Sequence, residues 1–97
     1  MAILIDPPIW PGRGRLWSHL VSDVSYAELH AFASRLGVPP RAFDGDHYDV
    51  PSASHAAAVT LGAQEVGCQE LLLRLTRAGL RRRKPAGARR RRGTARA

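Results

Sequence analysis

The chain of 97 residues has little that would let it be exported, cross-linked or inserted into a membrane. Its single cysteine, Cys68, cannot form an internal disulfide, which is typical of proteins in a reducing cytoplasm. No stretch approaches the roughly 18 consecutive apolar residues of a spanning helix, so we expect no membrane association. The opening residues 1–6 have no basic leader, and their apolar run is too short for a signal peptide. We therefore predict a cytoplasmic protein.

Acidic residues are absent from the last part of the chain. Residues 1–80 contain six basic and eight acidic side chains, a formal charge of −2, whereas residues 81–97 contain nine basic side chains and no acid, a charge of +9. The second segment also has no apolar residue larger than alanine, so it cannot bury enough surface to offset the entropy of ordering. We expect one folded domain over residues 1–80 and a disordered arginine-rich tail over residues 81–97. One interpretation is that this tail binds nucleic acid without sequence preference. The alternative is that it only keeps the protein soluble.

Apolar runs and turn residues alternate along residues 1–80, and this spacing predicts an α/β domain. Ser25 followed by Glu28 is the capping-box pattern that opens a helix, and Gly37 is a typical residue after a helix end. The expected strands are residues 2–5, 41–43 and 63–66. The expected helices are residues 25–36, residues 52–61, and a third that opens at residues 67–70 and stops at Gly79. This order predicts a short parallel or mixed sheet of about three strands with about three covering helices, in two or three layers.

Two segments between these elements are expected to be irregular. The prolines and glycines of residues 7–15 favour a loop. Residues 16–21 are expected to form a short helix or an irregular segment.

Two loops carry most of the polar side chains that could do chemistry. In open α/β sheets, ligands bind beyond the carboxyl ends of the strands. Asp6 follows the first predicted strand, and Asp46, His47 and Asp49 follow the second. If these strands are parallel neighbours, both loops face one crevice, where carboxylates and an imidazole would hold a divalent metal ion. The alternative is a simple turn, because Asp-Gly-Asp is common loop chemistry.

His19 and Asp23 are the candidate catalytic pair. If residues 16–23 are helical, the spacing of four residues places both side chains on one face. An aspartate beside a histidine fixes the tautomer of the imidazole for acid–base catalysis or for metal ligation. The alternative is that Asp23 belongs to the cap of the next helix and that His19 is half-exposed.

Arg13, Arg15 and Tyr48 are the candidate residues for holding a ligand. The two arginines lie in the string Gly-Arg-Gly-Arg, which suits a phosphate group because guanidinium forks match phosphate oxygens and glycines let backbone N–H groups approach. The string lacks the Gly-Lys-Ser/Thr ending of a Walker loop. The alternative is a solvated loop.

These residues lie in strings that resemble a small bacterial family of unknown function, family 4031. The resemblance covers nearly all of residues 1–80. The strings that carry it include Ile3-Leu4-Ile5-Asp6-Pro7, Gly14-Arg15-Leu16-Trp17-Ser18-His19-Leu20 and Phe43-Asp44-Gly45-Asp46-His47-Tyr48-Asp49-Val50-Pro51. The resemblance implies that these polar positions belong to the signature of the family, and it supplies no activity, cofactor or catalytic residue.

Functions from different classes fit these residues. The first choice is a module that binds a small ligand, a nucleotide or another phosphate-bearing molecule, since nothing in the sequence specifies a reaction. The alternative is a hydrolase or phosphoesterase in which a divalent metal held by the Asp/His cluster activates water and His19 acts as general base or acid. A third possibility is an accessory protein that associates with nucleic acid through the basic residues 81–97. Whether the protein is an enzyme stays open at this point.

Overall fold

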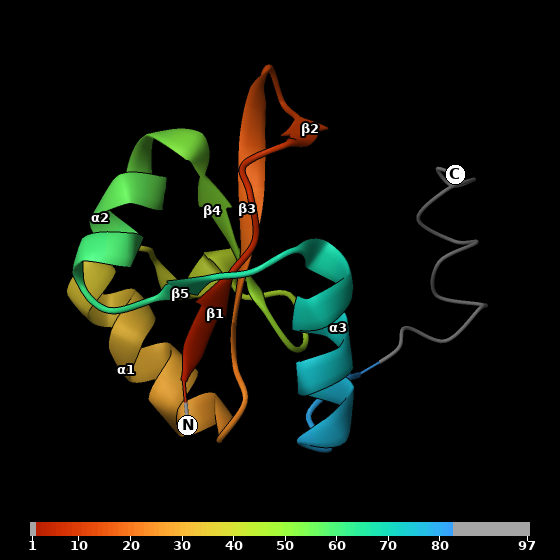
Figure 1. Ribbon diagram of the computed structural model, residues 1–97. Helices are drawn as coiled ribbons and strands as arrows, with labels where there is room; N and C mark the ends of the chain where they lie inside the picture. The colour runs from red at the N-terminus through yellow and green to blue at the C-terminus, as the bar shows by residue number, and fades with distance from the viewer. Residues whose placement is uncertain (1, 83–97) are drawn as a thin grey trace, which may run out of the picture.

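The computed structural model describes residues 2–82 and confirms an α/β domain with a mixed sheet and three α-helices (Figure 1). Most of the predicted tail, residues 83–97, lies outside the described residues. The strands are β1 (Ile3–Ile5), β2 (Trp10–Gly12), β3 (Arg15–Ser22), β4 (Tyr48–Pro51) and β5 (Gln64–Glu65). The α-helices are α1 (Tyr26–Leu36), α2 (His55–Thr60) and α3 (Cys68–Arg77), and the short 3-10 turns are η1 (Pro40–Ala42) and η2 (Ser52–Ser54).

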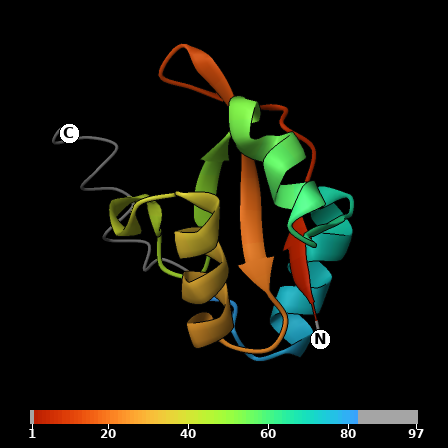
Figure 2. The ribbon, with the colours of Figure 1, turned by 90° about the vertical axis from the view of Figure 1, so that its left-hand side faces the viewer.

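β3 is the central strand of the sheet, as Figure 2 shows. Trp17 pairs with Trp10 on one side and with Pro51 on the other, and Leu20 likewise pairs with β1 and with β4. β4 therefore runs antiparallel along one edge of β3, while β2 and β1 share the other edge. β5 adds a parallel pairing to the far side of β1. β1, which precedes the first polar loop, and β4, which begins within the second, are thus not neighbours, because β3 lies between them.

Residues 10–22 form a β-hairpin, so both irregular segments expected from the sequence are corrected here. Pro11 fits into β2 because this strand pairs with β3 alone among the described strands, and a missing N–H on the free edge breaks no ladder. Arg13 and Gly14 make the turn with positive φ angles of 49° and 77°, as a tight two-residue hairpin requires. Figure 1 shows the tip of this hairpin projecting beyond the helices.

The second predicted strand is displaced along the chain. Residues 41–43 do not form it, since the 3-10 turn η1 begins at Pro40, where a missing N–H has no cost. The strand is β4 instead, which begins inside the predicted loop and places Asp49 within the sheet. The helix expected over residues 52–61 is present as η2 followed by α2, and the last strand and helix lie where they were predicted. No helix within residues 2–82 has the length and hydropathy needed to cross a bilayer.

α1 and α2 cover one face of the sheet (Figure 2). α1 begins as predicted, because the Ser25 hydroxyl accepts a hydrogen bond from the Glu28 backbone N–H at 3.0 Å. It ends at Gly37, whose φ of 87° suits glycine. The strands contribute alternate side chains to the core beneath these helices, namely Ile3, Ile5, Leu20, Tyr48 and Val50, which pack with Leu29, Phe32, Ala33, Val38, Ala58 and Ala63.

α3 covers only part of the opposite face (Figure 1). Leu4 and Val21 point to this face and form a smaller apolar cluster with the inner side of α3 and with Val66. His19 precedes Val21 by two residues, so strand alternation places it on the same face. Its register partner in β4 is Asp49. The part of the face beyond the small apolar cluster therefore carries polar side chains, and the site lies there.

Candidate metal centre

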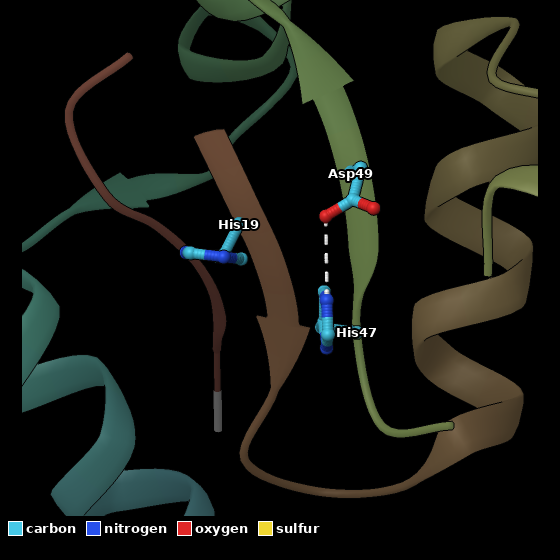
Figure 3. Close-up of side chains that lie close together, drawn as sticks. All are labelled: His19, His47 and Asp49. Carbon is cyan, nitrogen blue, oxygen red and sulfur yellow. Dashed lines mark ion pairs between the residues drawn. The ribbon is translucent and has the colours of Figure 1, made fainter. Parts of the chain in front are cut away.

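Two histidines and one aspartate bring their ligand atoms together on the α3 side of the sheet (Figure 3). His19 comes from β3, Asp49 from the facing position of β4, and His47 from the residue before β4. One nitrogen or oxygen of each side chain lies within 4.8 Å of the other two. The rings of His19 and His47 meet edge to face, with centroids 5.1 Å apart. We call His19, His47 and Asp49 the metal cluster.

A buried carboxylate holds the His19 ring in place. Asp6 is completely buried, and its Oδ2 lies 2.8 Å from Nδ1 of His19. The same carboxylate accepts hydrogen bonds from the His19 backbone N–H at 2.6 Å and from the Trp10 indole N–H at 3.0 Å. Because the Asp6 carboxylate is the acceptor of these hydrogen bonds, it favours the tautomer of His19 with the proton on Nδ1. Nε2 of His19 is then left with a lone pair for a proton or a metal.

The His47 ring is held in the same manner by a second buried carboxylate. Oδ1 of Asp46, which is 1% exposed, lies 2.7 Å from Nδ1 of His47. Its other oxygen accepts hydrogen bonds from the Arg81 side chain at 3.0 Å and from the Arg82 backbone N–H at 2.8 Å. Nε2 of His47 lies 3.3 Å from Oδ1 of Asp49, as the dashed line in Figure 3 marks. Both histidines therefore turn Nε2 away from their buried aspartates.

The charges of this region stabilise a protonated His47. Burial opposes the cation, but hydrogen bonds to Asp49 and Asp46 outweigh it and raise the pKa of His47 above 6.5. The hydrogen bond from His47 lowers the pKa of Asp49 below 3.8, against the effect of burial, and the positive charge of Arg13 adds to it. Burial raises the pKa of Asp46, yet its bonds to His47, Arg82 and Arg81 bring it below 3.8. At neutral pH both carboxylates are thus ionised.

These pKa shifts predict how the free energy of unfolding changes with pH when a chelator keeps the protein free of metal. Because the pKa of His47 is raised on folding, its stabilisation is complete below pH 6.5 and is lost as the pH rises through the raised value. We expect the metal-free protein to unfold at lower urea at about pH 9 than at about pH 6, and His47→Gln to reduce this difference. The pKa values of Asp46 and Asp49 are lowered on folding, whereas that of His47 is raised. The stabilisation from these two carboxylates is therefore lost only as the pH falls below 3.8. A His47-dependent gain of stability at alkaline pH would contradict this arrangement.

A pocket of about 280 Å³ opens beside the two histidines. His19, His47 and Trp10 form its polar side together with Asp6, Asp46 and Arg81. The opposite wall comes from α3 and is mostly apolar, with Cys68, Leu71, Leu72 and Leu75. The two histidines of the metal cluster are therefore accessible to a small molecule from this pocket.

Asp23 lies apart from His19, so the helical pairing expected from the sequence is wrong. His19 is in a strand, where four residues span about 13 Å and the spacing brings no side chains together. Asp23 instead accepts hydrogen bonds from the Ala2 backbone N–H and from Arg74, both at 2.7 Å. The aspartate that orients His19 is Asp6, which the sequence had suggested only as a metal ligand.

The three candidate ligand-holding residues separate into two places. Tyr48 is 2% exposed on the opposite face of the sheet, where its hydroxyl lies 2.7 Å from Nδ1 of His30. It is not part of the metal cluster. Arg13 and Arg15 lie at the hairpin tip, with their guanidinium carbons 5.2 Å and 5.7 Å from the centre of the Trp17 ring, and they line a pocket with Asp49 of the cluster.

The fold and the cluster define a small α/β protein with a candidate mononuclear metal centre. Residues 3–78 match DUF4031, a family described as proteins of unknown function, and the chain belongs to that family. This match confirms the resemblance seen in the sequence strings. No curated protein and no solved structure matches the chain.

Proposed function

We propose that this protein is a hydrolase that depends on one divalent metal ion bound by His19, His47 and Asp49. The observation that carries the proposal is the convergence of these three side chains, with each imidazole held at Nδ1 by a buried aspartate. Histidines that ligate metals almost always donate their other N–H to such an acceptor. The proposal changes the ligand set expected from the sequence, because Asp6 and Asp46 become outer partners of the two histidines.

The distances within the cluster fit a metal after small side-chain movements. Four ligand atoms around a metal with bonds of about 2.1 Å are about 3.4 Å from one another. The ligand atoms, now up to 4.8 Å apart, must approach by up to about 1.4 Å, which rotation of the half-buried His47 and Asp49 side chains can supply. The metal would replace the proton that His47 shares with Asp49.

Two imidazoles and one carboxylate favour a transition metal over calcium or magnesium. Three protein ligands leave coordination positions for water and substrate. A metal ion supplies a nucleophile at neutral pH, because it lowers the pKa of bound water to about 7. In this proposal His19, which the sequence suggested as general base or acid, is a metal ligand.

Metal binding is the first test of the proposed function. We expect the full chain to bind one Zn²⁺ or Mn²⁺ ion and to melt at a higher temperature when it does, since the ion binds only the folded state. His47→Ala and Asp49→Ala each remove a ligand of the metal ion. Loss of a residue that only hydrogen-bonds a ligand typically weakens metal binding about 10- to 100-fold, and we expect these two variants to lose more than that. Titration calorimetry and elemental analysis of dialysed protein measure this.

His30→Ala is the matched control, because His30 is a histidine outside the metal cluster. It should bind the metal as the unaltered chain does. Circular dichroism shows whether each variant is folded. If folded His47→Ala and Asp49→Ala bind the ion as tightly as the control, the proposed centre is wrong.

A further inference from the structure

A second pocket, of about 600 Å³, shares Asp49 with the metal cluster. Arg13 and Arg15 reach it from the β2–β3 hairpin, and Arg41 reaches it from η1. We propose that this arginine pocket binds the phosphate group of the substrate, and that the substrates are phosphate monoesters. The inference rests on the proposed metal-dependent hydrolysis and specifies its substrate class.

The hairpin holds two of the arginines close together. Arg13 makes the turn with a positive φ of 49°, an uncommon conformation for a residue other than glycine. The guanidinium carbons of Arg13 and Arg15 both lie within 6 Å of the centre of the Trp17 ring. At this distance a cation is attracted to the face of an indole. The Trp17 ring therefore contacts two guanidinium groups, and all three side chains line the same pocket.

The charges of the arginine pocket are not used in ion pairs inside the domain. Within residues 2–82, no carboxylate lies within 4.0 Å of a guanidinium nitrogen of Arg13, Arg15 or Arg41. Arg74 and Arg81 differ, because they pair with aspartates at 2.7 Å and 3.0 Å. Repulsion among neighbouring cations is relieved when an anion binds between them.

Two aspartates also line the pocket, and they do not cancel its charge. Asp44 and Asp49 face three arginines. Asp49 lies 3.3 Å from Nε2 of His47 and would be bound to the metal ion, so its negative charge is balanced within the cluster. The pocket with metal in place thus has a net positive charge. A monoester phosphate carries about −1.5 to −2 charges near pH 7, which matches such a site.

The position of the pocket suits catalysis as well as binding. A phosphate bound in this pocket would lie between the arginines and Asp49, which would hold the metal ion in the proposed centre. Metal ions and arginines stabilise the charge on a transferring phosphoryl group in this manner. The apolar pocket of about 280 Å³ on the histidine side can hold the organic part of the ester.

The reaction needs only water as co-reactant. A water oxygen forms a bond to phosphorus while the bond from phosphorus to the ester oxygen breaks, and its electron pair stays on that oxygen. One water proton passes to the leaving oxygen to give an alcohol, and the other remains on inorganic phosphate. No oxidation or reduction takes place.

The test compares phosphate binding by variants of the full chain. Inorganic phosphate is titrated into the metal-loaded protein at about 0.15 M salt, which screens the exposed charges. We expect Arg13→Gln/Arg15→Gln to bind phosphate at least about 10-fold more weakly, because charge-assisted hydrogen bonds are lost. Arg41→Gln should weaken binding in the same direction. The control Arg35→Gln/Arg77→Gln removes two charges from exposed helix positions and should have no effect.

Metal titration of the same variants separates the two proposals. If the metal binds normally and phosphate binding is equal in the pocket variants and the control, the arginine pocket is refuted and the metal centre stands. If no metal binds but phosphate binding still depends on Arg13 and Arg15, the anion site stands and the hydrolase proposal fails. Hydrolysis of p-nitrophenyl phosphate in preference to bis(p-nitrophenyl) phosphate is expected. The reverse preference would refute monoesters as the substrate class.

Discussion

Replacement of Asp6 by alanine is expected to impair both the fold and the metal centre. The change leaves the Trp10 indole N–H and two N–H groups of His19 without their acceptor, in a partly buried position. Each buried donor without a partner costs about 1–3 kcal/mol, and His19 is partly exposed, so we expect a loss of about 2–4 kcal/mol. The His19 ring also loses its orientation, so metal affinity should fall about 10- to 100-fold. Urea unfolding and metal titration measure the two effects.

Asp6→Asn separates the orientation of His19 from its packing. An amide keeps the shape of the carboxylate, but only one of its two terminal atoms is an oxygen that can accept a hydrogen bond. Both oxygens of Asp6 accept hydrogen bonds in the structure, so one donor would face the amide NH₂ group. His19 can relieve the conflict by moving its proton to Nε2, which removes the lone pair that would bind the metal. We therefore expect Asp6→Asn to be more stable than Asp6→Ala and still to bind metal weakly. Glu70→Gln, an exposed acid on α3, is the control for loss of one charge. Metal binding by Asp6→Ala equal to that of this control would contradict the role of Asp6.

Removal of the chain from Arg81 onward is expected to have the other large effect. Arg81 and Arg82 supply two of the three hydrogen bonds to the buried carboxylate of Asp46. Asp46 is buried but the Arg81 side chain is 36% exposed, so we expect a loss of about 1–3 kcal/mol from the acceptor left without these partners. The His47 ring should then be held less firmly, with about 10- to 100-fold weaker metal binding. Thermal unfolding and metal titration of the shortened chain measure this.

A chain that ends after Lys84 is the matched comparison, because it keeps both contacts to Asp46. It should equal the full chain in stability and metal affinity. Arg81→Ala removes only the side-chain contact and should lie between the two. Equal stability of the chains ending at residues 80 and 84 would show that the Asp46 contacts contribute nothing. Arg81 and Arg82 follow the boundary predicted at residue 80, and both contact Asp46 within residues 1–80.

Local patterns predicted the helices well. α1 is defined by side chains close to it in the sequence, since Ser25 caps its start and Gly37 its end. α3 likewise follows Gly67 and buries Leu71 and Leu75, which lie four residues apart on one side of the helix. Such signals depend on contacts within a few residues, and the rest of the fold does not change them.

β3 was missed because its pattern depends on distant partners. Leu20 and Val21 are both buried, on opposite faces, since α1 covers one side and α3 the other. The alternation typical of a strand with one solvated face is therefore blurred. Pro11 and Gly12 nearby favoured a loop, and only the pairing of residues 10–12 with residues 15–17 made this segment an edge strand.

The sequence by itself predicted the class of the fold and most of the residues that meet in the candidate site. Asp6, Asp46, His47 and Asp49 were predicted as one cluster because polar residues of these types are concentrated in two loops. The tertiary structure alone decided their arrangement. His19 meets Asp49 and Asp6 only because β3 pairs with β4 and β1, and Arg81 reaches Asp46 only because α3 packs against the sheet. These partners are 13 to 35 residues apart along the chain, and contacts over such separations are set by strand register and packing, which no local pattern contains.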